Sequence, residues 1–424
     1  MTEGALARST LVVALSIVGS AMGCVCSKST PSDDGGSITS ASSPTENPSF
    51  TRPIAAANVG GGAVIVAGLD VGAKALRVKK LGEHDELLGE KTLLDGLAAS
   101  AEAELKLVGA GGGAAITWRG QRNGKLERLL VVTRPDLSPM GEPTVVAAST
   151  CATKDALYWT DGKTVSSRAW AGTTPKVSDL PKDKEAGLVC AAHRAFAVLE
   201  EEESTSLLPL SPAEAGAPPT MTLLRDRDFG DDDQRERAEY TVGDDFGVVR
   251  LGNAGSFAIR ELRAGTLQPM RRLRTTIPHD DDVVAVDAST NALVIVYTHE
   301  ESDACGTSTT VATKVRAVRV DRTSWEESTI DLAPGACGKE IGPFFTSARP
   351  DGVMIAWVER TSAVGKPRSP ISGLAHVLVP AKGTGSPLAR IDEPADEMVD
   401  AGCDEKSCYA VALVAGGVKV LRYR

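Results

Sequence analysis

The chain has 424 residues, of which 42% are hydrophobic and 24% charged, a composition typical of globular rather than disordered proteins. This length fits two or three ordinary domains or one large repetitive domain. With 46 Lys and Arg against 56 Asp and Glu, the formal net charge is -10, and the basic patches that nucleic-acid phosphates require are missing. The sequence therefore predicts no nucleic-acid partner, although it permits a cationic one.

An apolar run over residues 11–23 dominates the amino terminus. It is too short to span a bilayer comfortably and has the length of the hydrophobic core of a secretory signal. Because Cys24 follows the run directly, the segment resembles a bacterial lipoprotein signal, which implies cleavage before Cys24 and a lipid on its sulfur. Val25, in place of the aspartate that favours retention in the inner membrane, then implies the outer membrane. Ordinary signal cleavage and an uncleaved anchor are the alternatives.

The sequence divides into three parts. Residues 1–23 form the lipoprotein-type signal peptide, and residues 24–49 are rich in Ser, Thr, Pro, Gly and Asp. A segment this polar cannot offset the entropy of ordering itself, so we expect a flexible tether between membrane and domain. Residues 50–424 form the folded domain.

A repeated unit runs through the folded domain, in which a polar turn precedes one small residue and then three or four apolar ones. The small residues are Ala63, Ala114, Ala156, Ala195, Ser256, Ala292, Gly352 and Cys408. A strand with one solvent-exposed face alternates apolar and polar residues, whereas a strand buried on both faces has a continuous apolar sequence. Each unit therefore predicts one doubly buried strand, flanked by an earlier strand and by a more polar later one.

Over residues 50–424 the chain thus resembles an all-β protein of the β-propeller class. The units recur about every fifty residues, within the range of propeller blades. Eight units predict eight blades. Seven blades are the alternative, because Ser256 precedes Ala292 by only 36 residues, and a pair of β-sandwiches is a third interpretation.

Six cysteines lie in the folded domain, and an even number in an exported chain predicts disulfides. Cys403 and Cys408 flank one tight turn. Cys305 and Cys337 fall in loops of the sixth unit that a propeller places on one face. Cys151 and Cys190 hold equivalent positions at the ends of neighbouring inner strands, where two buried free thiols are the alternative to a bond.

No sequence motif for nucleophilic, zinc-dependent or nucleotide chemistry is present. The best metal candidates flank the sixth unit, where Asp281 and Asp282 precede one strand while His299 and Glu300 follow the next. In a propeller both loops emerge on the same face, and histidine with carboxylates permits a divalent cation such as calcium. Two solvated acidic loops are the alternative.

A second candidate site is an acidic ring, formed by carboxylates that stand five or six positions before the turn in several units. Its members are Glu104, Glu185, Asp245, Asp282 and Glu397. If the inner strands line a central channel, these side chains meet at one mouth and attract cations. Ordinary loop carboxylates are the alternative.

We therefore expect a non-enzymatic binding or scaffold module at the cell envelope, whose partner is an envelope protein or a glycan. A propeller hydrolase or lyase with a site at the channel mouth, with or without the assistance of a metal, is the main rival hypothesis. A structural subunit of an envelope assembly is the third, because a propeller fold alone does not decide between these classes.

Overall fold

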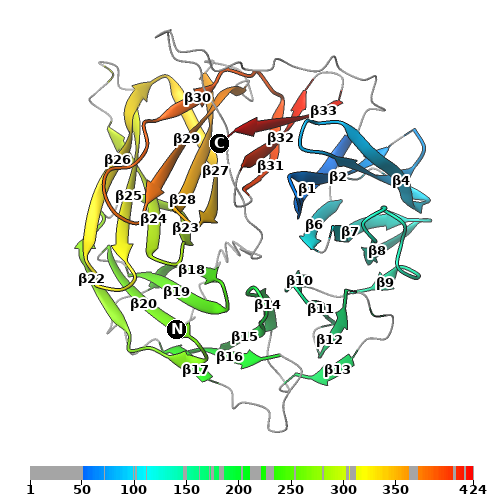
Figure 1. The fold of residues 1–424 in the computed structure, drawn as a ribbon, viewed down its shortest axis with the longest axis horizontal. Helices are drawn as coiled ribbons and strands as arrows, with labels where there is room; N and C mark the ends of the chain where they lie inside the picture. The colour runs from blue at the N-terminus through cyan, green and yellow to red at the C-terminus, as the bar shows by residue number, and fades with distance from the viewer. Residues whose placement is uncertain are drawn as a thin grey trace, which may run out of the picture.

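The computed structural model describes residues 51–423 except 71, 99, 101–102, 111, 147–149, 162, 171, 173–175, 181–185, 202–203, 211–220, 226–233, 253–254, 279–280, 302–304, 306–311, 362–370, 404–406 and 415–416. These residues form eight antiparallel sheets around one axis, an eight-bladed β-propeller (Figure 1). The predictions of an all-β fold and of eight blades are confirmed, and seven blades or paired sandwiches are wrong. In this part of the chain, no helix is long and apolar enough to cross a membrane.

Each blade is one sheet whose strands follow the order of the sequence outward from the axis, with small additions in blades 2 and 5. Blades 1 to 4 contain β1 (Thr51–Gly60), β2 (Ala63–Asp70), β3 (Ala75–Leu81) and β4 (Leu87–Asp95); β5 (Leu97–Ala98), β6 (Glu104–Ala110), β7 (Gly113–Arg122), β8 (Lys125–Val132) and β9 (Thr144–Val145); β10 (Thr150–Ala152), β11 (Ala156–Thr160), β12 (Thr164–Ala169) and β13 (Lys176–Asp179); and β14 (Ala186–Cys190), β15 (Ala195–Glu201), β16 (Ser204–Pro209) and β17 (Met221–Arg225).

The second half of the propeller continues in the same way. Blades 5 to 8 contain β18 (Gln234–Val242), β19 (Asp245–Gly252), β20 (Ser256–Arg263), β21 (Thr266–Leu267) and β22 (Arg271–Thr276); β23 (Asp282–Ala288), β24 (Ala292–Glu301), β25 (Ala312–Asp321) and β26 (Glu327–Cys337); β27 (Lys339–Arg349), β28 (Gly352–Thr361), β29 (Ile371–Pro380) and β30 (Ala389–Ile391); and β31 (Glu397–Cys403), β32 (Cys408–Val414) and β33 (Gly417–Tyr423).

The hydrophobic core lies between the blades, where one apolar cluster fills each of the eight interfaces. Consecutive residues of a strand point to opposite faces of its sheet. On β2, Ile65 packs toward blade 2, whereas Val64 and Val66 pack toward blade 8. The second strand of a blade is therefore buried on both faces, which explains its continuous apolar sequence.

Blade 5 departs from the repeat that the sequence suggests. Ser256 begins the third strand, β20, and the second strand is β19, which begins at Asp245. The third strand reads Ser-Phe-Ala-Ile and is mostly buried, so it resembles the second strands of the other blades. The register of this unit was wrong, and the short spacing between Ser256 and Ala292 came from this shift rather than from a missing blade.

The ring of blades closes where β33 of blade 8 meets the turns of blade 1. The Arg422 guanidinium lies 2.9 Å from Asp85 Oδ1 and donates to the Gly62 carbonyl oxygen at 2.7 Å and to that of Gly82. Beneath these contacts, Tyr409 and Val411 pack against the apolar side chains of β1 and β2. Closure thus combines an apolar cluster with one arginine that joins chain segments from opposite ends of the domain.

Three disulfides join the six cysteines of the folded domain. Cys151 on β10 and Cys190 on β14 link blades 3 and 4, with 5.6 Å between their Cα atoms. The other two bonds, Cys305–Cys337 and Cys403–Cys408, each lie within a single blade. All three candidate pairings are present in the structure.

Candidate functional site

The strongest candidate site lies at one end of blade 6, where Asp281 stands just before β23 and His299 lies near the end of β24. The His299 Nδ1 atom is 2.7 Å from Asp281 Oδ1. Asp281 is only 3% exposed, and its other carboxylate oxygen is buried without a hydrogen-bond partner. A carboxylate that accepts Nδ1–H orients the imidazole and leaves Nε2 as a hydrogen-bond acceptor or metal ligand.

The other two metal candidates do not join this pair. Asp282 and Glu300 are exposed, and each is the chain neighbour of a residue of the pair, so the alternation of the strand directs it to the opposite face. No group of three His, Cys, Asp or Glu side chains converges as a metal site within the described ranges. Of the four metal candidates, the structure thus brings together Asp281 and His299 as a dyad.

The dyad has charged neighbours on β24 and β25. Lys314 pairs with Glu301, and this hydrogen bond holds the pKa of the Glu301 carboxyl below its usual value, with a smaller contribution from the nearby His299. Across the same sheet, β24 and β25 continue to β26, whose last residue, Cys337, is joined to Cys305. This end of blade 6 therefore combines a histidine, both signs of charge and a covalent cross-link.

The residues of the predicted acidic ring do not share one end of the propeller. Glu104, Asp282 and Glu397 each begin the inner strand of their blade, whereas Asp245 begins the second strand of blade 5, at the opposite end of that sheet. Glu104 is paired with Arg119 at 2.8 Å, and Glu185 lies outside the described residues. The misplaced register of blade 5 explains why Asp245 was grouped with the others.

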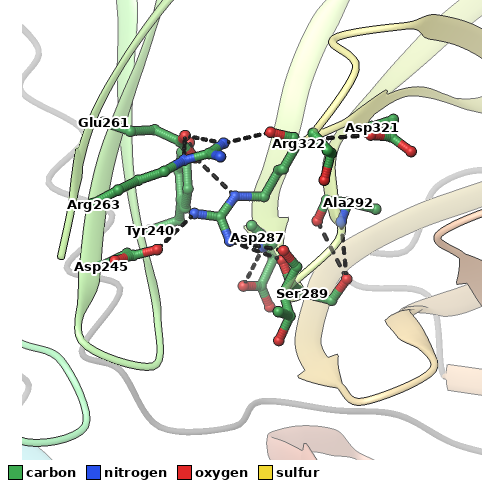
Figure 2. A network of polar contacts seen from close by, with 12 residues as sticks. Tyr240, Asp245, Glu261, Arg263, Asp287, Ser289, Ala292, Asp321 and Arg322 are labelled. Carbon is green, nitrogen blue, oxygen red and sulfur yellow. Dashed lines mark hydrogen bonds and ion pairs between the residues drawn. The ribbon is translucent and has the colours of Figure 1, made fainter. Parts of the chain in front are cut away.

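A buried charge network joins blades 5 and 6, and it was not predicted from the sequence (Figure 2). Glu261 on β20 and Arg322, in the turn after β25, have side chains that are 1% and 3% exposed, and Arg322 Nε lies 2.8 Å from Glu261 Oε1. Arg322 also reaches Asp245 Oδ2 at 3.2 Å. Its guanidinium further donates to the backbone carbonyl oxygens of Ser289 and Thr290.

The Glu261 carboxylate has two further partners. Tyr240 donates its hydroxyl to Glu261 Oε1 at 2.6 Å, and Arg263 pairs with the other oxygen. Burial, with the adjacent Glu261 carboxylate, raises the pKa of Tyr240 well above its usual value, so the phenol remains a donor at neutral pH. Every hydrogen-bond partner named in this network is a side chain or a backbone carbonyl of blade 5 or blade 6. We therefore interpret the network as a structural contact that holds these two blades together. The charged residues Glu261 and Arg263 on the mostly buried strand β20 were its sequence signal.

Two aspartates on inner strands also tie neighbouring blades together. Asp287 on β23 accepts hydrogen bonds from the Thr346 hydroxyl and the Ala348 backbone of blade 7, and Asp400 on β31 accepts one from the Ala56 backbone of blade 1. Desolvation by burial raises the pKa of each carboxyl to about 7. Near neutral pH these two groups therefore exchange protons with solvent.

Replacing Asp287 and Asp400 by asparagine should raise the free energy of unfolding over that of the parent protein, and this gain should be larger at pH 8 than at pH 5. A raised carboxyl pKa means that the native state keeps a proton that the unfolded chain loses above about pH 4, so the free energy of unfolding falls as pH rises toward 7. Asparagine keeps an acceptor oxygen but cannot ionise. Since both side chains are partly exposed, we expect a gain of about 1–2 kcal/mol per site, below the full linkage value.

Urea unfolding at the two pH values measures this effect. Asp179→Asn, on the exposed strand β13, is the matched control and should show no pH-dependent gain. An equal difference between variant and parent at pH 5 and pH 8 would contradict the assignment.

Burial shifts the titration of His376 on β29. It is 8% exposed, its imidazole lies 5.0 Å from the Tyr423 ring between centroids, and burial lowers its pKa to about 4. The side chain is therefore neutral at pH 7 and packs at the interface of blades 7 and 8. Its environment is that of a packing residue.

No protein-family model matches the sequence, and no curated protein matches it. Among solved structures, the chain is similar to a post-proline cleaving enzyme from Rickettsia typhi, with 10% identity and a TM-score of 0.47 over 89% of this chain and 64% of that one. Hsv2 from Kluyveromyces lactis shows 12% identity and a TM-score of 0.40, covering 77% of this chain and 93% of its own.

The β-propeller domain of Nup133 from Vanderwaltozyma polyspora shows 10% identity and a TM-score of 0.37, covering 74% of this chain and 92% of its own. At such identities a likeness concerns the fold alone. The identification of this chain as a β-propeller follows from its eight sheets.

Proposed function

We propose that this chain is an exported binding module of the bacterial cell envelope, held to the outer membrane by a lipid on Cys24. Its ring of blades presents a fixed surface to an envelope protein or a glycan. The observation that carries the proposal is the cross-linking of the ring, above all the Cys151–Cys190 bond between two blades. Disulfides persist in oxidising compartments outside the cytosol, in agreement with the signal-like amino terminus.

The rigidity of the scaffold supports binding as its role. The Cys151–Cys190 bond, the buried Glu261–Arg322 pair and the Arg422 contacts brace three different blade junctions. A surface held in this way loses little conformational entropy when a partner docks, which favours binding.

Replacing Cys24 by serine should abolish lipid attachment and release the protein from the membrane fraction. Only a cysteine sulfur at the cleavage position can receive the lipid in the proposed processing. Metabolic labelling with a radioactive fatty acid, followed by separation of inner and outer membranes, measures both results. Cys26→Ser is the matched control, because it removes a nearby thiol but should leave label and outer-membrane location unchanged. Label that persists in Cys24→Ser would overturn the anchor.

The binding role is tested by capture from envelope extract, using the detergent-solubilised full chain as bait, with and without a chelator. A saturable envelope protein or glycan that competes with unlabelled chain supports the proposal. Capture that depends on divalent cations would assign the contact to a cation site. Failure to retain any saturable component would contradict the binding role.

A second candidate, a hydrolase or lyase, draws on one observation, the Asp281–His299 dyad. An imidazole oriented by a buried carboxylate suits general base chemistry. Turnover of an envelope glycan or peptide that is lost in His299→Gln, and kept in His193→Gln, would favour the enzyme over the binding module.

A further inference from the structure

Arg168 on β12 is a half-buried arginine at the junction of blades 2 and 3. Its guanidinium donates one hydrogen bond, to the Met140 carbonyl oxygen of blade 2 at 3.4 Å. A guanidinium has five N–H donors, and a bond of that length is weak. Within the described parts of the chain, no Asp or Glu forms an ion pair with Arg168. The protein therefore leaves most of these donors, and the charge itself, without a partner.

Arginines at two other junctions of the ring have a carboxylate as a partner. Arg322 lies 2.8 Å from Glu261, and Arg422 lies 2.9 Å from Asp85. Taking a cation out of water costs free energy unless a counter-charge or several hydrogen bonds replace the water. Burial accordingly lowers the pKa of the Arg168 guanidinium. We therefore expect Arg168 to contribute little to stability, which is typical of a residue that serves binding.

An apolar surface lies beside the guanidinium. Leu157, the cross-strand partner of Arg168 on β11, belongs to the apolar cluster between blades 2 and 3. Met140 and Trp170 pack against the same cluster, and both are partly exposed. The Trp170 indole donates its Nε1–H to the Thr153 carbonyl oxygen at 3.0 Å, so its one polar atom is already used within the protein. A ligand that approaches Arg168 thus meets a cation next to an aromatic ring and a thioether.

The backbone holds these side chains in place before any ligand arrives. On the blade 2 side, the Met140 N–H donates to the Val132 carbonyl oxygen at 2.7 Å. On the blade 3 side, the Trp170 N–H donates to the Asp155 carbonyl oxygen at 3.2 Å. Because the surface is already ordered, a ligand loses little affinity to the cost of ordering it.

The charge of Arg168 selects an anion as the ligand. A planar guanidinium with free N–H groups fits a carboxylate or a phosphate in a bidentate arrangement. Since the chain has a net charge of -10, the protein as a whole does not attract anionic polymers. The contact must therefore be local, at the guanidinium.

The neighbouring strands favour a sugar over a peptide. An extended peptide commonly docks by pairing with a free strand edge, but β12 pairs with β11 on one edge and with β13 on the other. Recognition at this junction depends on side chains. An aromatic and an apolar side chain beside one charged group suit a sugar ring, which packs its C–H groups against them while its acidic group is held by the charge.

We propose that Arg168 binds the acidic group of a sugar, a carboxylate or a phosphate, while Trp170 and Met140 contact the sugar ring. The proposal narrows the partner of the binding module to an acidic glycan, and it rests on the proposed function for the source of that glycan.

Saturation-transfer NMR on the detergent-solubilised full chain tests the site, with glucuronic acid, a glucose phosphate and glucose as probes. We expect transfer to an acidic sugar and not to glucose, and the two acidic probes distinguish a carboxylate from a phosphate. Arg168→Gln should raise the dissociation constant of the acidic sugar by about tenfold or more, because it removes a charge-assisted contact. Arg77→Gln is the matched control and should leave binding unchanged, since Arg77 is paired with Asp70 at 3.2 Å.

Thermal unfolding of the same variants separates binding from a structural role. Arg168→Gln should melt at the temperature of the parent or above it, because the substitution removes a desolvated charge. A melting temperature several degrees below that of the parent would assign Arg168 to the fold and overturn the proposal.

Four binding results would also overturn it. They are no transfer to either acidic sugar, equal transfer to glucose, acidic-sugar binding that Arg168→Gln does not weaken, and binding of N-acetylalanine as tight as that of the acidic sugars. An envelope component that Arg168→Gln captures as tightly as the parent would overturn this site alone, and the proposed binding role would stand without it.

Discussion

Replacing Arg322 by methionine should destabilise the protein by about 3–5 kcal/mol, the largest effect that we expect from a single substitution. Arg322 and Glu261 are almost completely buried, and their closest atoms lie 2.8 Å apart. Methionine fills a similar volume but leaves the Glu261 carboxylate without its main counter-charge in a medium of low dielectric. The remaining partners, Tyr240 and Arg263, compensate only part of that cost. Urea unfolding followed by tryptophan fluorescence measures the loss.

Two comparisons separate charge burial from the loss of side-chain packing. Arg316→Met removes an arginine that also pairs with an aspartate, at 2.7 Å from Asp331, but these side chains are 32% and 71% exposed. We expect that variant to cost less than about 1 kcal/mol. The double variant Glu261→Leu/Arg322→Met removes both buried charges and should recover most of the stability lost in Arg322→Met. Equal costs for Arg322→Met and Arg316→Met would show that the buried network does not hold blades 5 and 6 together.

The fold was predictable because its main constraint is local in the sequence. A strand between two packed sheets must be apolar at consecutive positions, as Val64, Ile65 and Val66 are, and this pattern recurs once per blade. The same reasoning misplaced blade 5, where the third strand, β20, is as apolar as a second strand. Local hydrophobicity reports burial, but it does not distinguish two strands of one blade that are both buried.

The candidate site was predictable only in part. Asp281 and His299 are 18 positions apart and meet because they lie at the joined ends of two neighbouring strands. Glu261 and Arg322 are 61 positions apart and belong to different blades, so their contact depends on how two sheets are rotated against each other. That rotation is not encoded in any local pattern.

The raised pKa values of Asp287 and Asp400 were also beyond prediction from the sequence. Their cause is desolvation between inner strands, and an aspartate in a strand sequence carries no sign of how much water reaches it. The sequence located the disulfides more successfully, because equivalent positions in neighbouring repeats, such as Cys151 and Cys190, are brought close by the repetition of the fold.

Removing the Cys151–Cys190 bond should cost about 4 kcal/mol, and removing Cys403–Cys408 about 2 kcal/mol. In the chain-entropy account, a cross-link destabilises the unfolded state more when it closes a longer loop, and the two bonds span 39 and 5 residues. All four cysteines are at most 2% exposed, so the double variants Cys151→Ala/Cys190→Ala and Cys403→Ala/Cys408→Ala remove similar packing. Their difference in unfolding free energy, measured with urea under non-reducing conditions, therefore reports loop closure. If the two double variants lose the same unfolding free energy, the longer loop closed by Cys151–Cys190 gives no additional restraint on the unfolded chain. The proposed rigid binding surface then loses the main covalent bond that was taken to support it.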